Sequence, residues 1–88
     1  MKEIERVLRA MANMRRLSIV KYLKSAKEAT VGGISGEIKL SFRSTSKHLH
    51  LLHSADVVEK EQRGSCVYYS LSPNAHRLVQ TILSHLSS

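Results

Sequence analysis

The 88-residue chain contains one cysteine, one proline and no tryptophan. A single cysteine cannot close a disulfide within the chain, so nothing in the sequence argues for an oxidising compartment. No apolar run approaches the roughly 18 residues that a membrane-spanning helix needs. The N-terminus is charged and helical in pattern, without the apolar stretch of a signal peptide. We therefore expect a soluble, cytoplasmic protein with no membrane partner.

Acidic side chains are also scarce. Fourteen lysines and arginines stand against seven aspartates and glutamates, which gives a formal net charge of +7. This excess favours a polyanionic partner; nucleic acid is the commonest choice and an anionic membrane surface the rival. Small proteins are often basic without any binding role, so charge alone does not decide. At this length we expect a single domain over residues 1–88, with a thin core that oligomerisation would help to stabilise.

The sequence offers no catalytic constellation. It contains no recognisable pair of nucleophile and base, no glycine-rich loop for phosphate and no paired carboxylates. We therefore expect a protein that is not an enzyme and that carries no cofactor.

Apolar residues recur at helical spacing in five segments. The predicted helices cover residues of about 2–12, 14–24, 31–39, 42–54 and 73–86. Asn13, Thr30 and Ser41 have the chemistry of N-caps for the second, third and fourth helices. Ser72-Pro73 is expected to open the fifth, with serine as the cap and proline at the first helical position.

Residues 57–71 predict a β-hairpin directly after the fourth helix. Two β-prone runs flank a turn near Arg63-Gly64. Residues 25–29, between the second and third helices, are interpreted as a short polar connection. The resulting order of elements is that of a winged helix-turn-helix, so the expected fold is mainly α with a small two-stranded wing.

Residues 41–53 hold two cations, three histidines and no acid. At about 100° per residue, Thr45, Leu49 and Leu52 fall on one side of this helix, and Arg43 and Lys47 fall on the other. An apolar inner face with a cationic outer face is what a helix needs to lie in a DNA major groove.

Side chains on this outer face and on the wing are the expected DNA contacts. Arg43 is the best candidate for a bidentate contact to guanine, and Lys47 for a phosphate contact. Phe42 either touches a thymine methyl or packs on the preceding turn, and packing is favoured. Polar wing residues are expected at a phosphate or in the minor groove. The complete set is Ser41, Phe42, Arg43, Ser44, Ser46, Lys47, His50, Lys60, Gln62 and Arg63.

The first and last predicted helices both carry an apolar stripe. A thin core has little room for both stripes, and a large exposed apolar patch usually marks an interface. We therefore expect a homodimer; the alternative is that both helices only cover the domain's own core. The expected interface residues are Ile4, Val7, Leu8, Met11, Leu78, Val79, Ile82, Leu83 and Leu86.

Three stretches of the chain carry a family resemblance. They are residues 8–17, residues 40–52 with Ser46-Lys47-His48-Leu49 at their centre, and residues 64–71 with their tyrosine pair. From residue 8 to residue 86 the chain resembles the ArsR-type (arsenic-repressor-like) winged helix-turn-helix repressors of bacteria and archaea. The resemblance implies a homodimer that binds operator DNA and represses transcription. It also implies that the first and last helices form the dimer interface.

The chain departs from this family where many members bind metal. Many of them sense metals through a cysteine pair in the third helix, but residues 30–39 contain no cysteine, histidine or adjacent acids. Others have an acid–histidine pattern in the last helix, where this chain offers only Asn74, His76 and His85. We therefore expect no metal site; a zinc site shared across a dimer through His76 or His85 stays open as the lesser alternative.

The remaining histidines and the cysteine have simpler interpretations. His48 and His50 point about 160° apart on a helix, so with His53 they cannot converge on one ion. We expect His48 to hydrogen-bond at the edge of the core and His50 to face DNA. Cys66 is expected to be an idle thiol on the wing, with a redox role as the lesser alternative.

The leading hypothesis is thus a sequence-specific, dimeric transcriptional repressor. Two alternatives stay open: a winged-helix module that binds another protein, and a nonspecific DNA-binding protein that packages DNA.

Overall fold

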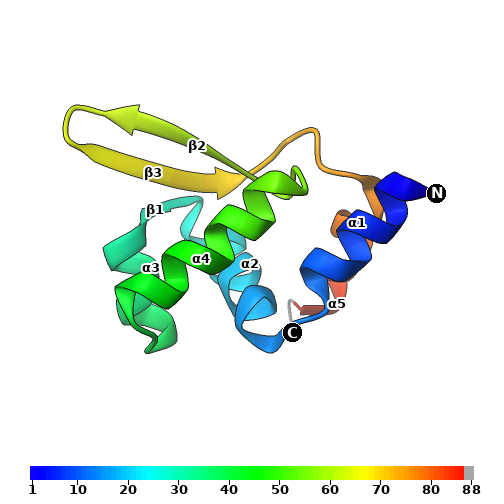
Figure 1. Ribbon diagram of the computed structural model, residues 1–88, viewed down its shortest axis with the longest axis horizontal. Helices are drawn as coiled ribbons and strands as arrows, with labels where there is room; N and C mark the ends of the chain where they lie inside the picture. The colour runs from blue at the N-terminus through cyan, green and yellow to red at the C-terminus, as the bar shows by residue number, and fades with distance from the viewer. Residues whose placement is uncertain (87–88) are drawn as a thin grey trace.

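Within residues 1–86, which the computed structural model describes, five helices and three strands follow one another along the chain (Figure 1). The helices are α1 (Lys2–Met11), α2 (Met14–Ala26), α3 (Val31–Ile38), α4 (Phe42–Ser54) and α5 (Arg77–Leu86). The strands are β1 (Glu28–Thr30), β2 (Val58–Arg63) and β3 (Cys66–Leu71). The predicted class, mainly α with a winged helix-turn-helix order, is confirmed, and the first four helices end within two residues of the predicted bounds.

Side-chain caps fix the starts of α2, α3 and α4. Asn13 accepts hydrogen bonds from two backbone N–H groups in the first turn of α2, Thr30 from one in α3 and Ser41 from one in α4. Each bond gives a partner to an amide that the helix itself leaves free. All three predicted caps are confirmed, and α4 therefore begins at Phe42 as the sequence indicates.

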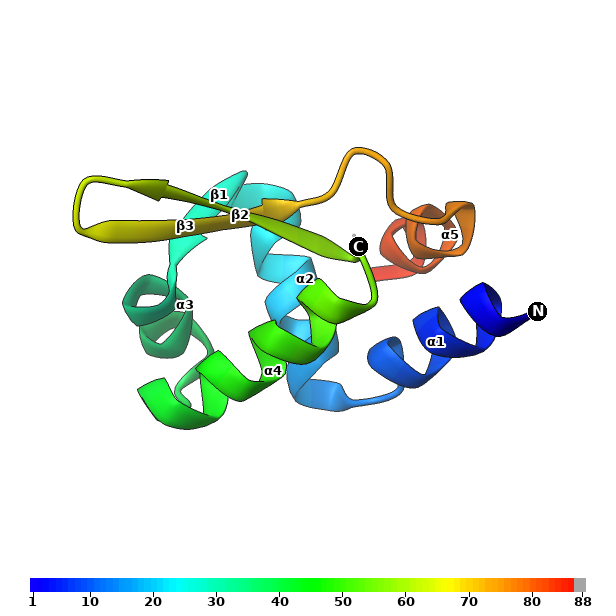
Figure 2. The ribbon, with the colours of Figure 1, turned by 45° about the horizontal axis from the view of Figure 1, so that its top comes forward.

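The predicted two-stranded wing is present as β2 and β3, but the sheet has a third strand, β1, that was not predicted (Figure 2). The residues interpreted as a polar connection include β1, which pairs antiparallel with β3 and places Ala29 opposite Tyr69. Without β1, the backbone of β3 would have an unpaired edge on that side. A strand of three residues is too short for hydrophobic alternation to reveal it.

The β2–β3 hairpin closes close to the predicted turn. Val58 pairs with Leu71 at its base and Arg63 with Cys66 at its tip, which leaves a loop of two residues. Gly64, the first of these, has φ of 62°, a conformation that glycine adopts without a steric penalty.

The predicted start of α5 at Ser72-Pro73 was wrong, because α5 begins at Arg77. Ser72 and Pro73 open a turn instead, in which the N–H of Ala75 donates to the carbonyl of Ser72 at 3.2 Å. Proline fits the second position of a turn as well as the first turn of a helix, since both need the same φ. His76 caps α5 in place of serine: its Nδ1 accepts from the backbone N–H two residues ahead at 3.0 Å.

The core lies between the inner faces of the helices and the base of the sheet. Its largest fully buried side chains include Ile19, Leu23, Ile34, Leu49 and Leu52. None of the helices in the described part of the chain is long and apolar enough to cross a membrane.

The apolar stripes of α1 and α5 are each divided between core and surface. Val7, Met11, Val79 and Leu83 are buried, with exposed fractions of 4% or less, so the domain has more room for these helices than we expected. On α1, Ile4 and Leu8 keep exposed fractions of 38% and 49%. On α5, the other apolar residues are half-buried at the margin of the core: Leu78, Ile82 and Leu86.

Candidate nucleic-acid interface

Helix α4 separates an apolar inner face from a polar outer face. Thr45, Leu49 and Leu52 have an exposed fraction of 0%. Arg43 and Lys47 are exposed on the other side, as the helical spacing predicted. Because the inner face is packed into the core, the cationic side chains of α4 point to the outside.

A shallow groove runs along this outer face. Its lining comes entirely from α4: Phe42, Arg43, Ser46, Lys47, His50 and Leu51. The groove thus brings five of the predicted DNA-contacting residues together, with no carboxylate among them. The ring of Phe42 is 62% exposed, so the favoured expectation that it packs on the preceding turn was wrong. Of the remaining helix residues, Ser41 uses its hydroxyl as the cap, and Ser44 is half-buried in the first turn.

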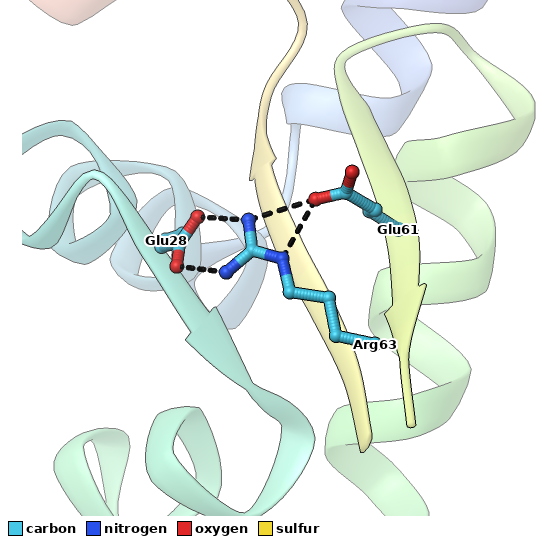
Figure 3. Close-up of polar contacts among 3 residues, drawn as sticks. All are labelled: Glu28, Glu61 and Arg63. Atoms are coloured by element: carbon cyan, nitrogen blue, oxygen red, sulfur yellow. Dashed lines mark hydrogen bonds and ion pairs between the residues drawn. The ribbon is translucent and has the colours of Figure 1, made fainter. Parts of the chain in front are cut away.

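The wing holds its arginine in a different way (Figure 3). The two terminal nitrogens of Arg63 donate to the two carboxylate oxygens of Glu28, both at 2.7 Å. Its Nε donates to Glu61 at 2.8 Å, and its guanidinium carbon lies 4.6 Å from the centre of the Tyr68 ring. Hydrogen bonding to Arg63 lowers the pKa of Glu28, and the bonds to Glu28 and then Glu61 raise the pKa of Arg63.

This cluster changes the expected role of the wing. Arg63 joins β2 to β1, and its guanidinium is taken up by two carboxylates instead of standing free at the tip. Lys60 and Gln62 are exposed on the same strand, as expected. Sequence reasoning missed Glu28 because the strand that carries it was not predicted. An acid and an arginine that are 35 residues apart give no local signal.

Behind the outer face, Arg16 connects three helices. Its Nε donates to the carbonyl of Ala10 at 2.6 Å and its Nη2 to that of Arg9 at 3.3 Å, both in the last turn of α1. Its Nη1 lies 3.2 Å from Nδ1 of His48 on α4. The expectation that His48 hydrogen-bonds at the edge of the core is confirmed. Burial, followed by the charge of Arg16, lowers the pKa of His48. Because a guanidinium N–H can only donate, Nδ1 of His48 is the acceptor of this bond.

The other histidines and the cysteine do not form a cluster with one another. In residues 1–86 no three side chains of the types that bind metal gather at one place. His76 caps α5, His85 is exposed, and Cys66 is a free, exposed thiol on β3. The absence of a metal site stays a prediction.

Residues 13–60, from the cap of α2 into β2, match the family model of the bacterial regulatory protein, arsR family. The chain belongs to this family. The match spans more than half of the sequence and confirms the resemblance found in its motifs.

Two relatives are about one-third identical to this chain. The transcriptional activator HlyU of Vibrio cholerae is 34% identical over 80 residues, which are 91% of this chain and 73% of HlyU. The transcriptional repressor SdpR of Bacillus subtilis is 33% identical over 66 residues, which are 75% of this chain and 72% of SdpR.

Solved structures agree with the fold. Reduced HlyU from Vibrio cholerae has a TM-score of 0.83 at 32% identity, over 97% of this chain and 85% of that one. The homodimeric winged helix-turn-helix DNA-binding domain Mb0332 from Mycobacterium bovis has a TM-score of 0.80 at 28% identity, over 97% of this chain and 75% of that one.

Proposed function

We propose that this arsR-family protein is a homodimeric, sequence-specific DNA-binding regulator of transcription that inserts α4 into the major groove and acts as a repressor. The observation that carries the proposal is the outer groove of α4, which holds two cations and no carboxylate. Its relatives include both an activator and a repressor. Repression is the simpler activity, because it requires only that the operator is occupied. The proposal assigns no catalytic step, cofactor or metal to the chain.

Within α4, Arg43 reads a base and Lys47 holds a phosphate. Arg43 lies in the first turn of the helix, where recognition helices reach base edges, and its planar guanidinium matches the O6 and N7 acceptors of guanine. Lys47 lies one turn further along and is suited to a phosphate contact. The exposed ring of Phe42 beside Arg43 is placed for a thymine methyl. Ser46 and His50 line the same groove and contact a base edge or the backbone.

On the wing, Lys60 and Gln62 are the phosphate contacts. Both are exposed on β2. Arg63 contributes through the position of the wing, because its guanidinium is bound to Glu28 and Glu61. Ser41 and Ser44 likewise shape the start of α4, with the hydroxyl of Ser41 accepting from the N–H of Ser44 at 3.1 Å.

A second copy of the chain covers the outer edges of α1 and α5. These helices pack together (Figures 1 and 2). Each leaves apolar side chains that are exposed or half-buried: Ile4, Leu8, Leu78, Ile82 and Leu86. The interface is narrower than the sequence suggested, since Val7, Met11, Val79 and Leu83 already belong to the core. The homodimeric state of Mb0332 supports a homodimer.

Selection of bound sequences from random duplex DNA tests the function. We expect a palindromic motif with half-sites about one helical turn apart, since a symmetric dimer presents two α4 helices. The double variant Arg43→Gln/Lys47→Gln should enrich no motif. A matched variant, Lys21→Gln on the exposed surface of α2, should enrich the same motif as the natural chain. Absence of any motif for the natural chain would contradict sequence-specific regulation and favour a packaging protein or a protein-interaction module.

Light scattering tests the dimer. Leu8→Lys should give a folded monomer that binds DNA weakly, because two half-sites are no longer engaged together. Leu8 suits this test better than Leu83, whose side chain is 4% exposed and needed in the core. If the natural chain is monomeric at tens of micromolar, the dimeric arrangement fails.

A further inference from the structure

Helix α1 lies near the C-terminal half of α4 (Figures 1 and 2). The two helices, with the start of α2, line a second groove. Its charged lining consists of Lys2, Glu5, Arg6 and Arg9 on α1 and Arg16 on α2. From α4 it receives Leu51 and Ser54. None of these side chains was among the expected DNA contacts, so the function proposed above leaves this groove unexplained.

The groove has an excess of positive charge. Four cationic side chains line it with one carboxylate, Glu5, which lies 3.3 Å from Arg9. Arg16 donates to two carbonyls at the end of α1 and to His48, and none of the described carboxylates pairs with it. Cations gathered around one concave surface raise its potential and attract a polyanion.

The two grooves are continuous across α4. Leu51 lines both of them. At about 100° per residue, Ser54 falls on the same side of α4 as Arg43 and Lys47. A DNA strand that lies on the outer face of α4 therefore passes Leu51, which is 48% exposed, to reach the cations of α1.

We propose that the α1–α4 groove binds the phosphate backbone of the DNA that flanks the major-groove site, with Arg6 and Arg9 as the phosphate contacts. This inference rests on the proposed DNA-binding function and extends it to a third element of the fold. Phosphate contacts fix the register and orientation of a protein on the duplex without reading the sequence. The groove thus increases the affinity for DNA and lengthens the DNA segment that the protein contacts, whereas Arg43 supplies the sequence specificity.

The same helix can serve DNA and a second copy of the chain. At about 100° per residue, Lys2, Arg6 and Arg9 cluster on one side of α1, and Ile4 and Leu8 fall on another. A change at Arg6 or Arg9 therefore leaves the proposed dimer interface intact, which separates the two roles in an experiment.

The test measures operator affinity against salt concentration, with a selected duplex and a shuffled duplex of the same length. Arg6→Gln and Arg9→Gln should each lower the slope of log K against log salt by about 0.9 and weaken binding between about three- and tenfold. Both should weaken binding to the two duplexes equally and leave the selected motif unchanged. Lys21→Gln is the matched control, because Lys21 lines a separate groove with Glu37 and Tyr22.

Removal of a carboxylate from the groove should change DNA affinity in the opposite direction. Glu5→Gln frees Arg9 and removes the acid from the groove, so it should tighten binding and steepen the salt dependence. Glu37→Gln removes the same charge from the control groove and should have the smaller effect. Circular dichroism and light scattering verify that each variant is folded and dimeric.

The outcomes separate this proposal from the function it rests on. If Arg6→Gln and Arg9→Gln retain the natural slope while Arg43→Gln abolishes selective binding, the groove proposal is overturned and the function stands. A loss of affinity that accompanies loss of the dimer also overturns it. If the natural chain binds no duplex, the proposed function fails first, and the groove proposal fails with it.

Discussion

On the wing, Arg63 is paired with Glu28 and Glu61 and lies over the ring of Tyr68, whereas on α4 Arg43 and Lys47 border a groove without any carboxylate. In the sequence, both segments carry basic residues that we expected to contact DNA. The structure distinguishes them by whether the charge has a partner inside the chain.

This difference teaches how a basic residue should be assigned. A guanidinium that already donates to two carboxylates has fewer N–H groups left for a phosphate, and the carboxylates offset its positive charge. An exposed ion pair contributes little to stability, so the main effect of the Arg63 cluster is geometric: it ties the tip of β2 to β1. The cations of α4 have no such partner in the described chain and are available to DNA. The following predictions test this contrast, from the largest expected effect to the smallest.

Arg43→Lys should abolish discrimination at one base pair of each half-site. The ammonium of lysine lacks the planar fork that matches guanine, and a bidentate contact contributes about 1–3 kcal/mol of discrimination. Competition between the selected operator and a duplex changed at that position measures the loss. Arg63→Lys should leave base discrimination unchanged. Full discrimination by Arg43→Lys would mean that α4 does not read the sequence through this residue.

The buried side of α4 also contains an unsatisfied polar group. The hydroxyl of Thr45 has an exposed fraction of 0% and no hydrogen-bond partner among the described residues. Thr45→Val should therefore stabilise the fold by about 1 kcal/mol, because valine removes a desolvated hydroxyl and keeps the shape. Urea denaturation measures the change in the free energy of unfolding. A destabilised variant would show that the hydroxyl has a partner after all.

Glu28→Gln should loosen the wing without a change in the number of phosphate contacts. The neutral amide loses the charge-assisted bonds that join Arg63 to β1, so amide hydrogen exchange in β2 and β3 should rise several-fold. Exchange in α4 should stay as it is, which provides an internal control. Unchanged exchange at the wing would mean that the cluster does not position it.

The smallest effect concerns His48. Its pKa is lowered in the folded state, so the unfolded chain takes up a proton first as the pH falls through the ordinary histidine value of about 6.5. The contribution of His48 to stability is complete above that value and is lost as the pH falls towards the lowered pKa. His48→Gln should therefore make stability less dependent on pH between about pH 7 and pH 5. Denaturation series on both proteins measure this, and equal pH dependence would contradict the assignment.

The sequence predicted the parts of the fold that local rules determine. Residues that are close together in the sequence determine these features: the bounds of α4, the caps at Asn13 and Ser41, and the hairpin turn near Gly64. The division of α4 into a buried and an exposed face followed from helical spacing alone.

Features that depend on distant residues were missed. β1 is defined by its pairing with β3, and the partner of Arg63 lies 35 residues away. Arg16 meets His48 from another helix, 32 residues apart in the chain. The start of α5 was missed for a different reason. Ser72-Pro73 satisfies the rules of a turn and of a helix start equally well. Only the surrounding structure determines which of the two forms.

The salt dependence of operator binding for two single-charge variants tests the central contrast most directly. Lys47→Gln removes a cation that has no carboxylate in its groove, and Arg63→Gln removes one that is held by Glu28 and Glu61. We predict that Lys47→Gln lowers the slope of log K against log salt by about 0.9, the value for one lost phosphate contact, and that Arg63→Gln leaves the slope unchanged. Equal losses of slope in the two variants would contradict the account, because they would show that the wing arginine leaves its carboxylates to bind DNA.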